Sequence, residues 1–125
     1  MSDQIVFESV FPIGDTDVNA LPILELGPAI GYYCLALGFT LVSKSQDSAV
    51  LRRDAVQICL ARNGTDPGQA SCYFAVSDVE ALRQELDARG IEPSALREDN
   101  HDGKPYRIFF AKEPYGVCFC FGQPV

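Results

Sequence analysis

Two cysteines near the C-terminus are the residues whose type and spacing first suggest chemistry. Cys118 and Cys120 lie two apart in an apolar segment, so in a β-strand both thiols project from the same face. A cation or a helix N-terminus nearby would lower the pKa of such thiols and make them reactive. No His or Lys is adjacent to them in the sequence, which favours inert thiols that pack within a strand.

The cysteine count supports the same interpretation. The chain has five cysteines, each within an apolar run, and no two of them form a C-x-x-C pair. Zinc-ribbon and thioredoxin-like sites therefore lack support, and a bridge between Cys118 and Cys120 would distort their strand. We expect all five thiols to be reduced: Cys34, Cys59, Cys72, Cys118 and Cys120.

Three further polar residues could take part in chemistry. His101, the single histidine, could be a general base or a metal ligand, although a solvated loop histidine is the simpler interpretation. Ser71 has no identifiable triad base or acid and is interpreted as a strand hydroxyl. Glu25 interrupts an apolar segment. It would pair with an arginine, face solvent at an edge, or select a cationic group on a ligand.

Composition limits the class of protein. The 125 residues are 47% hydrophobic and 22% charged, as in one globular domain spanning residues 1–125. The formal net charge is −7 and the basic residues are scattered, so no nucleic-acid partner is expected. No apolar run approaches the roughly 20 residues that span a bilayer, and the N-terminus does not resemble a signal peptide. We expect a cytoplasmic protein with no membrane partner.

The last third of the chain predicts a hairpin that would position the thiols. Residues 106–111 and 117–121 are apolar and rich in aromatic residues, and they flank the turn residues 113–116, a pattern typical of antiparallel strands. Tyr106 and Arg107, beside a polar loop at 97–103, are candidates for the lip of a cleft. The second strand has a bulky face suited to packing and a small face that could line a cavity, consisting of Val117, Phe119 and Phe121, and of Cys118, Cys120 and Gly122.

The rest of the chain follows one pattern twice. An arm (1–19) is followed by a strand (20–26), a helix (29–37) and three strands at 39–44, 49–53 and 55–62. The second half repeats this order with a strand (70–76), a helix opened by a Ser77-to-Glu80 capping box, a broken strand (91–96) and the hairpin. The glycines that end the two helices, Gly38 and Gly90, lie 52 residues apart. This pattern predicts an α+β fold of two βαβββ modules, 20–62 and 70–123, whose curved sheets form a cleft, with an N-terminal extension before them.

The doubled βαβββ unit is similar to the vicinal oxygen chelate superfamily, which contains glyoxalases, bleomycin resistance proteins and extradiol dioxygenases. Residues 32–39, Tyr-Tyr-Cys-Leu-Ala-Leu-Gly-Phe, resemble the end of the family's first helix, and residues 74–82 resemble its second strand-to-helix junction. Gly90 and Ile91 match the Gly-Ile after its second helix. The turn at 113–116, Glu-Pro-Tyr-Gly, resembles the family's Asp-Pro-Asp-Gly. The resemblance covers residues 20–123.

The resemblance implies one divalent metal, which the family's enzymes hold with His, Gln or Glu from the first, fourth, fifth and eighth strands. In this chain Ser71 stands in the place of the fifth-strand His, and Cys120 in the place of the eighth-strand Glu. The first strand offers no such ligand at 18–24, and the fourth offers Gln57 or Cys59, depending on register. Because the set is incomplete, we expect no metal and no cofactor.

What remains resembles the metal-free bleomycin resistance branch. We expect a protein that sequesters or senses a small organic ligand, cationic or aromatic, and the resemblance implies a homodimer that exchanges segments between chains. Two alternatives stay open: a metal-dependent lyase or dioxygenase whose ligands lie in another register, and a thiol-based sensor that uses Cys118 or Cys120. The expected cleft residues are Glu25, Gln57, Cys59, Ser71, Tyr106, Arg107, Cys118 and Cys120.

Overall fold

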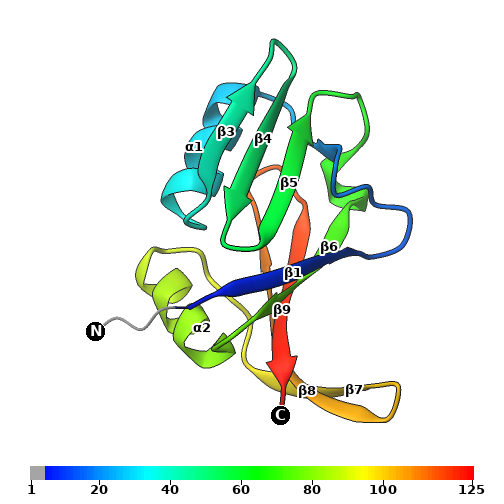
Figure 1. Ribbon diagram of the computed structural model, residues 1–125, viewed down its shortest axis with the longest axis vertical. Coiled ribbons are helices and arrows are strands. Elements are labelled where there is room, and N and C mark those ends of the chain that lie inside the picture. The colour runs from blue at the N-terminus through cyan, green and yellow to red at the C-terminus, as the bar shows by residue number, and fades with distance from the viewer. Residues whose placement is uncertain (1–4) are drawn as a thin grey trace.

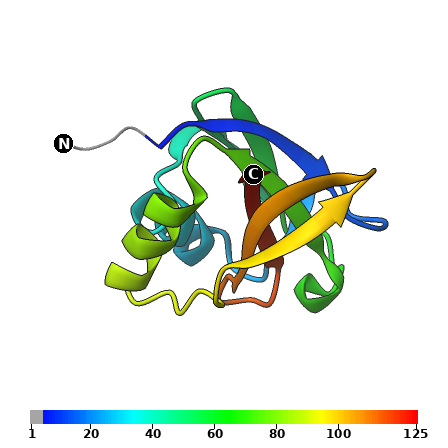
Figure 2. The ribbon, with the colours of Figure 1, turned by 90° about the horizontal axis from the view of Figure 1, so that it is seen from below.

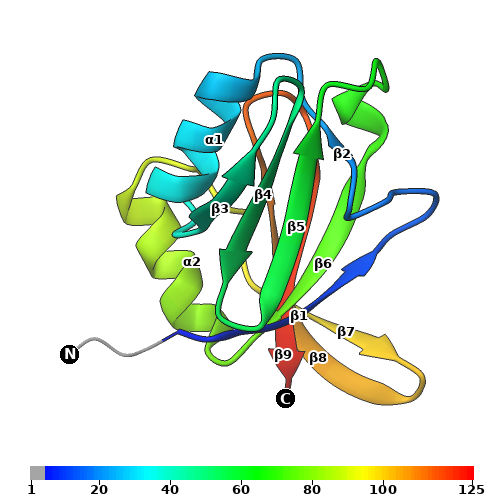
Figure 3. The same ribbon diagram turned by 45° about the horizontal axis from the view of Figure 1, so that its top comes forward.

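A computed structural model of the protein describes residues 5–125, apart from the side chain of His101. Across these residues the strands form two sheets, and both helices lie on the same side of the molecule (Figures 1, 2 and 3). The elements follow in the order β1 (Phe7–Pro12), β2 (Leu21–Pro22), α1 (Leu26–Leu35), β3 (Thr40–Lys44), β4 (Ser48–Arg53), β5 (Val56–Ala61), a 3-10 turn (Pro67–Gln69), β6 (Ser71–Val76), α2 (Val79–Ala88), β7 (Arg97–His101), β8 (Lys104–Lys112) and β9 (Cys118–Pro124).

The strand order confirms the predicted α+β fold of two βαβββ modules. The first module forms a four-stranded sheet in the order β2-β5-β4-β3, and the second contributes four strands of a sheet in the order β1-β6-β9-β8-β7. The N-terminal extension supplies β1, which pairs antiparallel with β6. In Figure 1, β1 crosses the molecule below the β4–β5 turn and so lies where the two modules meet.

One core joins the two modules. The inner faces of both sheets and the buried stripes of both helices belong to a single cluster of buried apolar side chains. At its centre Phe74 packs against Phe119 with ring centroids 5.3 Å apart, and Tyr33 of α1 packs against Phe119 at 5.8 Å. Because aromatic rings bury large areas, these contacts hold the modules together.

The N-cap of the second helix differs from the prediction. Asp78, rather than Ser77, caps α2: its carboxylate accepts from the backbone N–H of Ala81 at 3.0 Å. The Ser77 hydroxyl instead accepts from the N–H of Val6 at 2.8 Å. Both predicted C-terminal glycines are confirmed, since Gly38 and Gly90 have φ of +75° and +80°, the left-handed conformation that ends helices.

Three segments were predicted wrongly. Residues 91–96 form no strand, whereas the polar segment predicted as a loop contains β7, which pairs antiparallel with β8. The strand predicted at 20–26 is only two residues long, and α1 begins at Leu26. An edge strand needs only one hydrogen-bonded neighbour and can be polar on both faces, so apolar alternation did not reveal β7.

The predicted C-terminal hairpin is confirmed as β8 and β9, with Phe110 opposite Cys120 and Ala111 opposite Phe119. At its turn, buried Glu113 accepts from the backbone N–H groups of Tyr115 and Val117 at 2.7 and 3.0 Å. Within residues 5–125, no helix has the length and apolar character needed to cross a membrane.

Candidate functional site

A hollow of about 500 Å³ lies on the outer face of the five-stranded sheet, away from the shared core. Side chains from β1, β6, β7, β8 and β9 meet there, so both the N-terminal extension and the second module contribute. The lining consists of Phe11, Pro12, Ile13, Tyr73, Asp99, Tyr106, Ile108 and Cys120.

Strand register explains why these residues share one face. Tyr73 of β6 lies between Phe11 of β1 and Cys120 of β9, and Asp99 of β7 lies opposite Tyr106 of β8. Residues directly opposite each other in neighbouring strands project from the same face. The buried alternate residues, such as Phe74 and Phe119, project into the core.

Gly122 makes room for the floor of the hollow. A Cβ on Gly122 would lie 2.5 Å from the Tyr73 Oη and 2.8 Å from the Ile108 Cγ2, so the ring of Tyr73 extends across β9 where a side chain is absent. The Tyr73 hydroxyl is buried and has no hydrogen-bond partner among the residues that the structure describes. Burial, followed by the nearby Cys120, raises the pKa of Tyr73 to about 12.

The hollow is aromatic and apolar, with one acidic side chain. Phe11 and Ile13 are 54% and 43% exposed, which is unusual for large apolar side chains and typical of binding surfaces. Phe11 lies beside Tyr73, with ring centroids 6.2 Å apart. Asp99 is the charged residue of the lining; Arg97, on the same side of β7, is outside it.

The Cys120 thiol is a poor nucleophile. Burial, followed by neighbouring Cys118 and Asp99, raises the pKa of the Cys120 thiol to about 12. At neutral pH this thiol is protonated, and the thiolate is the nucleophilic form. All five cysteines are free, and the environment of Cys120 disfavours a sensor based on its reactivity.

Four of the eight predicted cleft residues lie on the face that carries the hollow. Tyr106 and Cys120 line it. Ser71 and Cys118 are opposite each other on β6 and β9, two residues further along the same face.

The other four lie elsewhere. Arg107 is on the opposite face of β8, where it pairs with Glu80 of α2 at 3.5 Å, so it lies outside the lining of this hollow. Gln57 and Cys59 are in β5, in the four-stranded sheet. Glu25 is exposed at the N-cap of α1, and the buried carboxylate of the described residues is Glu113, which is 3% exposed.

The donor set does not fit a divalent metal. Ser71 and Cys120, which stand where the superfamily's enzymes have His and Glu, bring no carboxylate or imidazole to this face. Among residues with described side chains, no group of three or more His, Cys, Asp or Glu could hold an ion. We therefore derive no metal-dependent step for this site.

Sequence reasoning missed most of the lining. Tyr73 could have been found from the alternation of β6, because it shares the face of Ser71. Asp99 required β7 to be recognised as a strand. Phe11, Pro12 and Ile13 could not be placed, because nothing in the sequence shows that the extension pairs with β6.

Comparisons with known proteins identify the family of the chain. A sequence profile of the glyoxalase/bleomycin resistance protein/dioxygenase superfamily matches residues 20–121. A bleomycin resistance protein of Geobacillus stearothermophilus is 32% identical over 93 residues, covering 59% of this chain and 70% of the relative, and one of Staphylococcus aureus matches to the same extent.

Solved structures show the same fold at lower identity. The bleomycin-binding protein of Streptomyces verticillus, complexed with copper(II)-bleomycin, has a TM-score of 0.67 at 22% identity and covers 85% of this chain and 93% of that one. The bleomycin resistance determinant of transposon Tn5 has a TM-score of 0.73 at 19% identity, covering 88% and 98%. The profile match and the bleomycin resistance relatives establish that the chain belongs to the glyoxalase/bleomycin resistance protein/dioxygenase superfamily.

Proposed function

We propose that this protein binds a small, planar, positively charged organic molecule in the hollow and sequesters or senses it, without a metal and without turnover. The observation that carries this proposal is the lining itself: three aromatic rings and one carboxylate, Phe11, Tyr73, Tyr106 and Asp99.

Each part of the lining favours such a ligand. Aromatic pairs contribute about 0.5–1.5 kcal/mol beyond the area they bury, and a cation over an exposed ring adds about 0.5–1 kcal/mol. Asp99 is exposed, so its attraction for a cation is about 1 kcal/mol at most. We therefore expect the rings to provide most of the affinity and Asp99 to provide discrimination between charges.

The relatives supply one specific candidate. Proteins similar to this chain are named for bleomycin resistance, and one structure of the same fold holds copper(II)-bleomycin. Bleomycin is therefore one ligand to test. The proposal itself rests on ring and charge complementarity.

We also propose a homodimer with segment exchange. β1 pairs with one strand only, at the edge of its sheet, and residues 13–20 separate it from β2. An arm held at an edge can pair with the same strand of a second copy at little cost. Sedimentation equilibrium tests the dimer, and a monomer at all accessible concentrations would contradict it.

Calorimetric titration with matched ligands tests the binding proposal. We expect 9-aminoacridine, a planar cation, to bind more tightly than neutral acridine, and acridine-9-carboxylate to bind least. Asp99→Asn should weaken 9-aminoacridine binding by about two- to fivefold, the equivalent of roughly 0.5–1 kcal/mol, and leave acridine binding unchanged.

Asp87→Asn is the matched control, because Asp87 is an exposed carboxylate on α2, outside the hollow. The proposed ligand class would be refuted if all three acridines bound with equal affinity, or if none of them bound. Bleomycin, with and without copper, is titrated alongside. Stoichiometric metal in protein purified without chelator, together with activity on the hemithioacetal of methylglyoxal and glutathione, would refute sequestration and support the enzyme alternative.

A further inference from the structure

The strand β1 joins two parts of the molecule. Its first residues contact the junction between the modules, and its last residues form a wall of the hollow. A β-bulge lies between them: Phe7 is opposite Val76, but Ser9 is opposite Ala75. Because a bulge shifts the alternation by one residue, Phe7 faces the core while Phe11 faces the hollow.

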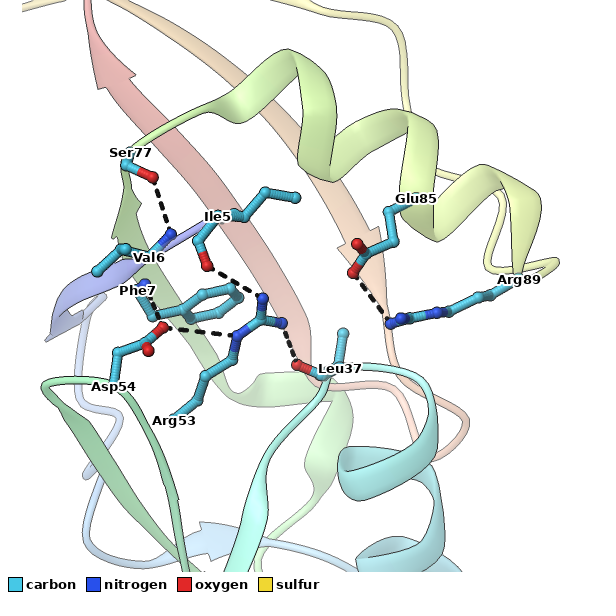
Figure 4. Close-up of polar contacts among 9 residues, drawn as sticks. All are labelled: Ile5, Val6, Phe7, Leu37, Arg53, Asp54, Ser77, Glu85 and Arg89. Atoms are coloured by element: carbon cyan, nitrogen blue, oxygen red, sulfur yellow. Dashed lines mark hydrogen bonds and ion pairs between the residues drawn. The ribbon is translucent and has the colours of Figure 1, made fainter. Parts of the chain in front are cut away.

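The N-terminal end of β1 is held by Arg53 and Asp54, at the end of β4 (Figure 4). The Arg53 guanidinium donates to the carbonyl of Ile5 at 3.2 Å and to that of Leu37, just after α1, at 2.7 Å. The Asp54 carboxylate accepts from the N–H of Phe7 at 2.9 Å, and its Oδ2 lies 3.7 Å from the Arg53 Nε. We name Arg53 and Asp54 the latch.

The Arg53 side chain of the latch packs against the core. The Arg53 guanidinium lies 4.2 Å from the centre of the Phe7 ring, and that ring is fully buried beside Phe39 and Phe74 at 5.8 and 5.5 Å. A Cβ on Gly38 would lie 2.7 Å from the Arg53 Nη1, so glycine at this position lets the guanidinium reach the helix end. Figure 4 shows the side chain extending between β1 and the end of α1.

The C-terminal end of β1 is held by hydrogen bonds between uncharged groups. Past Pro12, the N–H of Ile13 donates to the carbonyl of Ser71 at 3.1 Å, and the N–H of Ser71 donates to the Thr16 hydroxyl at 2.9 Å. Phe11 and Ile13 are among the more exposed apolar residues of the described chain. The position of this wall therefore depends on the docking of β1 as a unit.

We infer that Arg53 and Asp54 are positioning residues for the hollow and control ligand affinity through β1, without touching the ligand. The inference deepens the proposed function, because the affinity it concerns is that of the proposed site. An edge strand, paired on one side, opens locally at low free-energy cost unless something holds it. Apparent affinity falls in proportion to the fraction of molecules whose site is complete.

The coupling also works in reverse. A ligand that contacts Phe11 and Ile13 binds the docked strand better than the open one. By linkage it must stabilise docking by the same factor that docking strengthens binding. A merely structural role for Arg53 would lower the global free energy of unfolding without raising the Kd of the ligand.

The experiment compares Arg53→Gln and Asp54→Asn with Arg62→Gln and Asp47→Asn. The second pair is the matched control, since Arg62 and Asp47 form an exposed ion pair at 3.3 Å that does not touch β1. Three quantities are measured on the full chain: amide hydrogen exchange of β1, the Kd of 9-aminoacridine, and the rate of Cys120 alkylation read by mass spectrometry.

In the latch variants we expect exchange of the β1 amides to rise about tenfold, since hydrogen bonds with a charged partner are lost. The Kd should rise at least threefold and Cys120 alkylation should accelerate. Saturating 9-aminoacridine should slow β1 exchange in the wild type. The Arg62→Gln and Asp47→Asn controls should match the wild type in amide exchange, Kd and alkylation rate. Arg53→Lys, which keeps the charge, should give values between those of the wild type and Arg53→Gln.

Several results would overturn the inference. Faster β1 exchange with unchanged Kd would show that docking and binding are uncoupled, while the proposed function would stand. If the wild type does not bind 9-aminoacridine, the proposed ligand class fails by itself. In that case Cys120 alkylation decides the inference: an unchanged rate in the latch variants would end it, whereas a faster rate would support it. Should Arg53→Gln fail to fold, Asp54→Asn and Ser77→Ala, which removes the acceptor of the Val6 N–H, carry the same test.

Discussion

Replacing Gly122 with alanine tests the construction of the hollow directly. Gly122 lies on β9 opposite Ile108 of β8 and Ala75 of β6, and its backbone is not in the left-handed region. The substitution therefore introduces no backbone strain. Its whole effect comes from one methyl group, which would lie 2.5 Å from the Tyr73 Oη, 2.9 Å from the Tyr73 Cε2 and 2.8 Å from the Ile108 Cγ2.

The magnitude follows from two opposing terms. Inserting a methyl group into a packed site costs about 1–3 kcal/mol, and replacing glycine reduces the entropy of the unfolded chain, which returns about 0.4–1 kcal/mol. We expect Gly122→Ala to lower the free energy of unfolding by about 1–2 kcal/mol. Since Ile108 is buried and Tyr73 is half-buried, the ring of Tyr73 is the part that moves, and it moves into the hollow.

Urea denaturation and ligand titration together measure the effect. The Kd of 9-aminoacridine should rise at least tenfold, because the displaced ring occupies the site. The loss of stability should shrink by at least about 0.5 kcal/mol in a Tyr73→Leu background, as expected for residues in contact. Gly31→Ala is the control, because its Cβ would meet nothing within 4 Å and alanine favours the α1 helix. Wild-type stability and affinity in Gly122→Ala would refute this account of the floor.

Two further predictions concern titratable groups. Burial raises the pKa of Glu113 above its usual 4.5, although the N–H groups of Val117, Tyr115 and Gly116 oppose the shift. Glu113 therefore makes its full contribution to the free energy of unfolding below pH 4.5, and this contribution declines as pH rises through the folded-state pKa. Glu113→Gln keeps an oxygen acceptor for the turn and should remove that decline, which urea denaturation from pH 4 to 8 would show; parallel wild-type and variant profiles would contradict it. Because the pKa of Cys120 is raised to about 12, iodoacetamide should alkylate it far more slowly at pH 8 than a cysteine of the unfolded chain, and equal rates would restore the thiol-sensor hypothesis.

The repeated fold could be predicted because its signals are local. Gly38 and Gly90 end helices through their own backbone conformation, and the alternation of β9 separates bulky from small residues whatever its neighbours are. The buried Phe119 and Phe121 and the lining residue Cys120 follow from that alternation alone. These features need no knowledge of which strands pair.

The composition of the site could be predicted only in part, because it depends on pairing between distant strands. Tyr106 and Arg107 are neighbours in sequence, yet one lines the hollow and the other pairs with Glu80 of α2. A one-residue change of register exchanges the two faces, so a correct strand with unknown pairing could not separate them. Glu25 illustrates a different limit: it was placed in an apolar strand, but the helix begins earlier and leaves it exposed at the N-cap.

The wall of the hollow that β1 supplies could not be predicted from the sequence, and we expect it to influence ligand choice most. The superfamily profile begins at residue 20, whereas Phe11, Pro12 and Ile13 come from the extension that precedes it. The family match therefore describes the floor of the hollow, including Tyr73 and Cys120, and says nothing of the wall that β1 supplies. If that wall decides which ring system fits, exchanging residues 5–19 for the corresponding segment of a bleomycin resistance relative should change the order of ligand affinities, while stability and fold stay close to those of the parent chain. An unchanged order would place ligand choice in the second module alone and remove the functional significance of the extension.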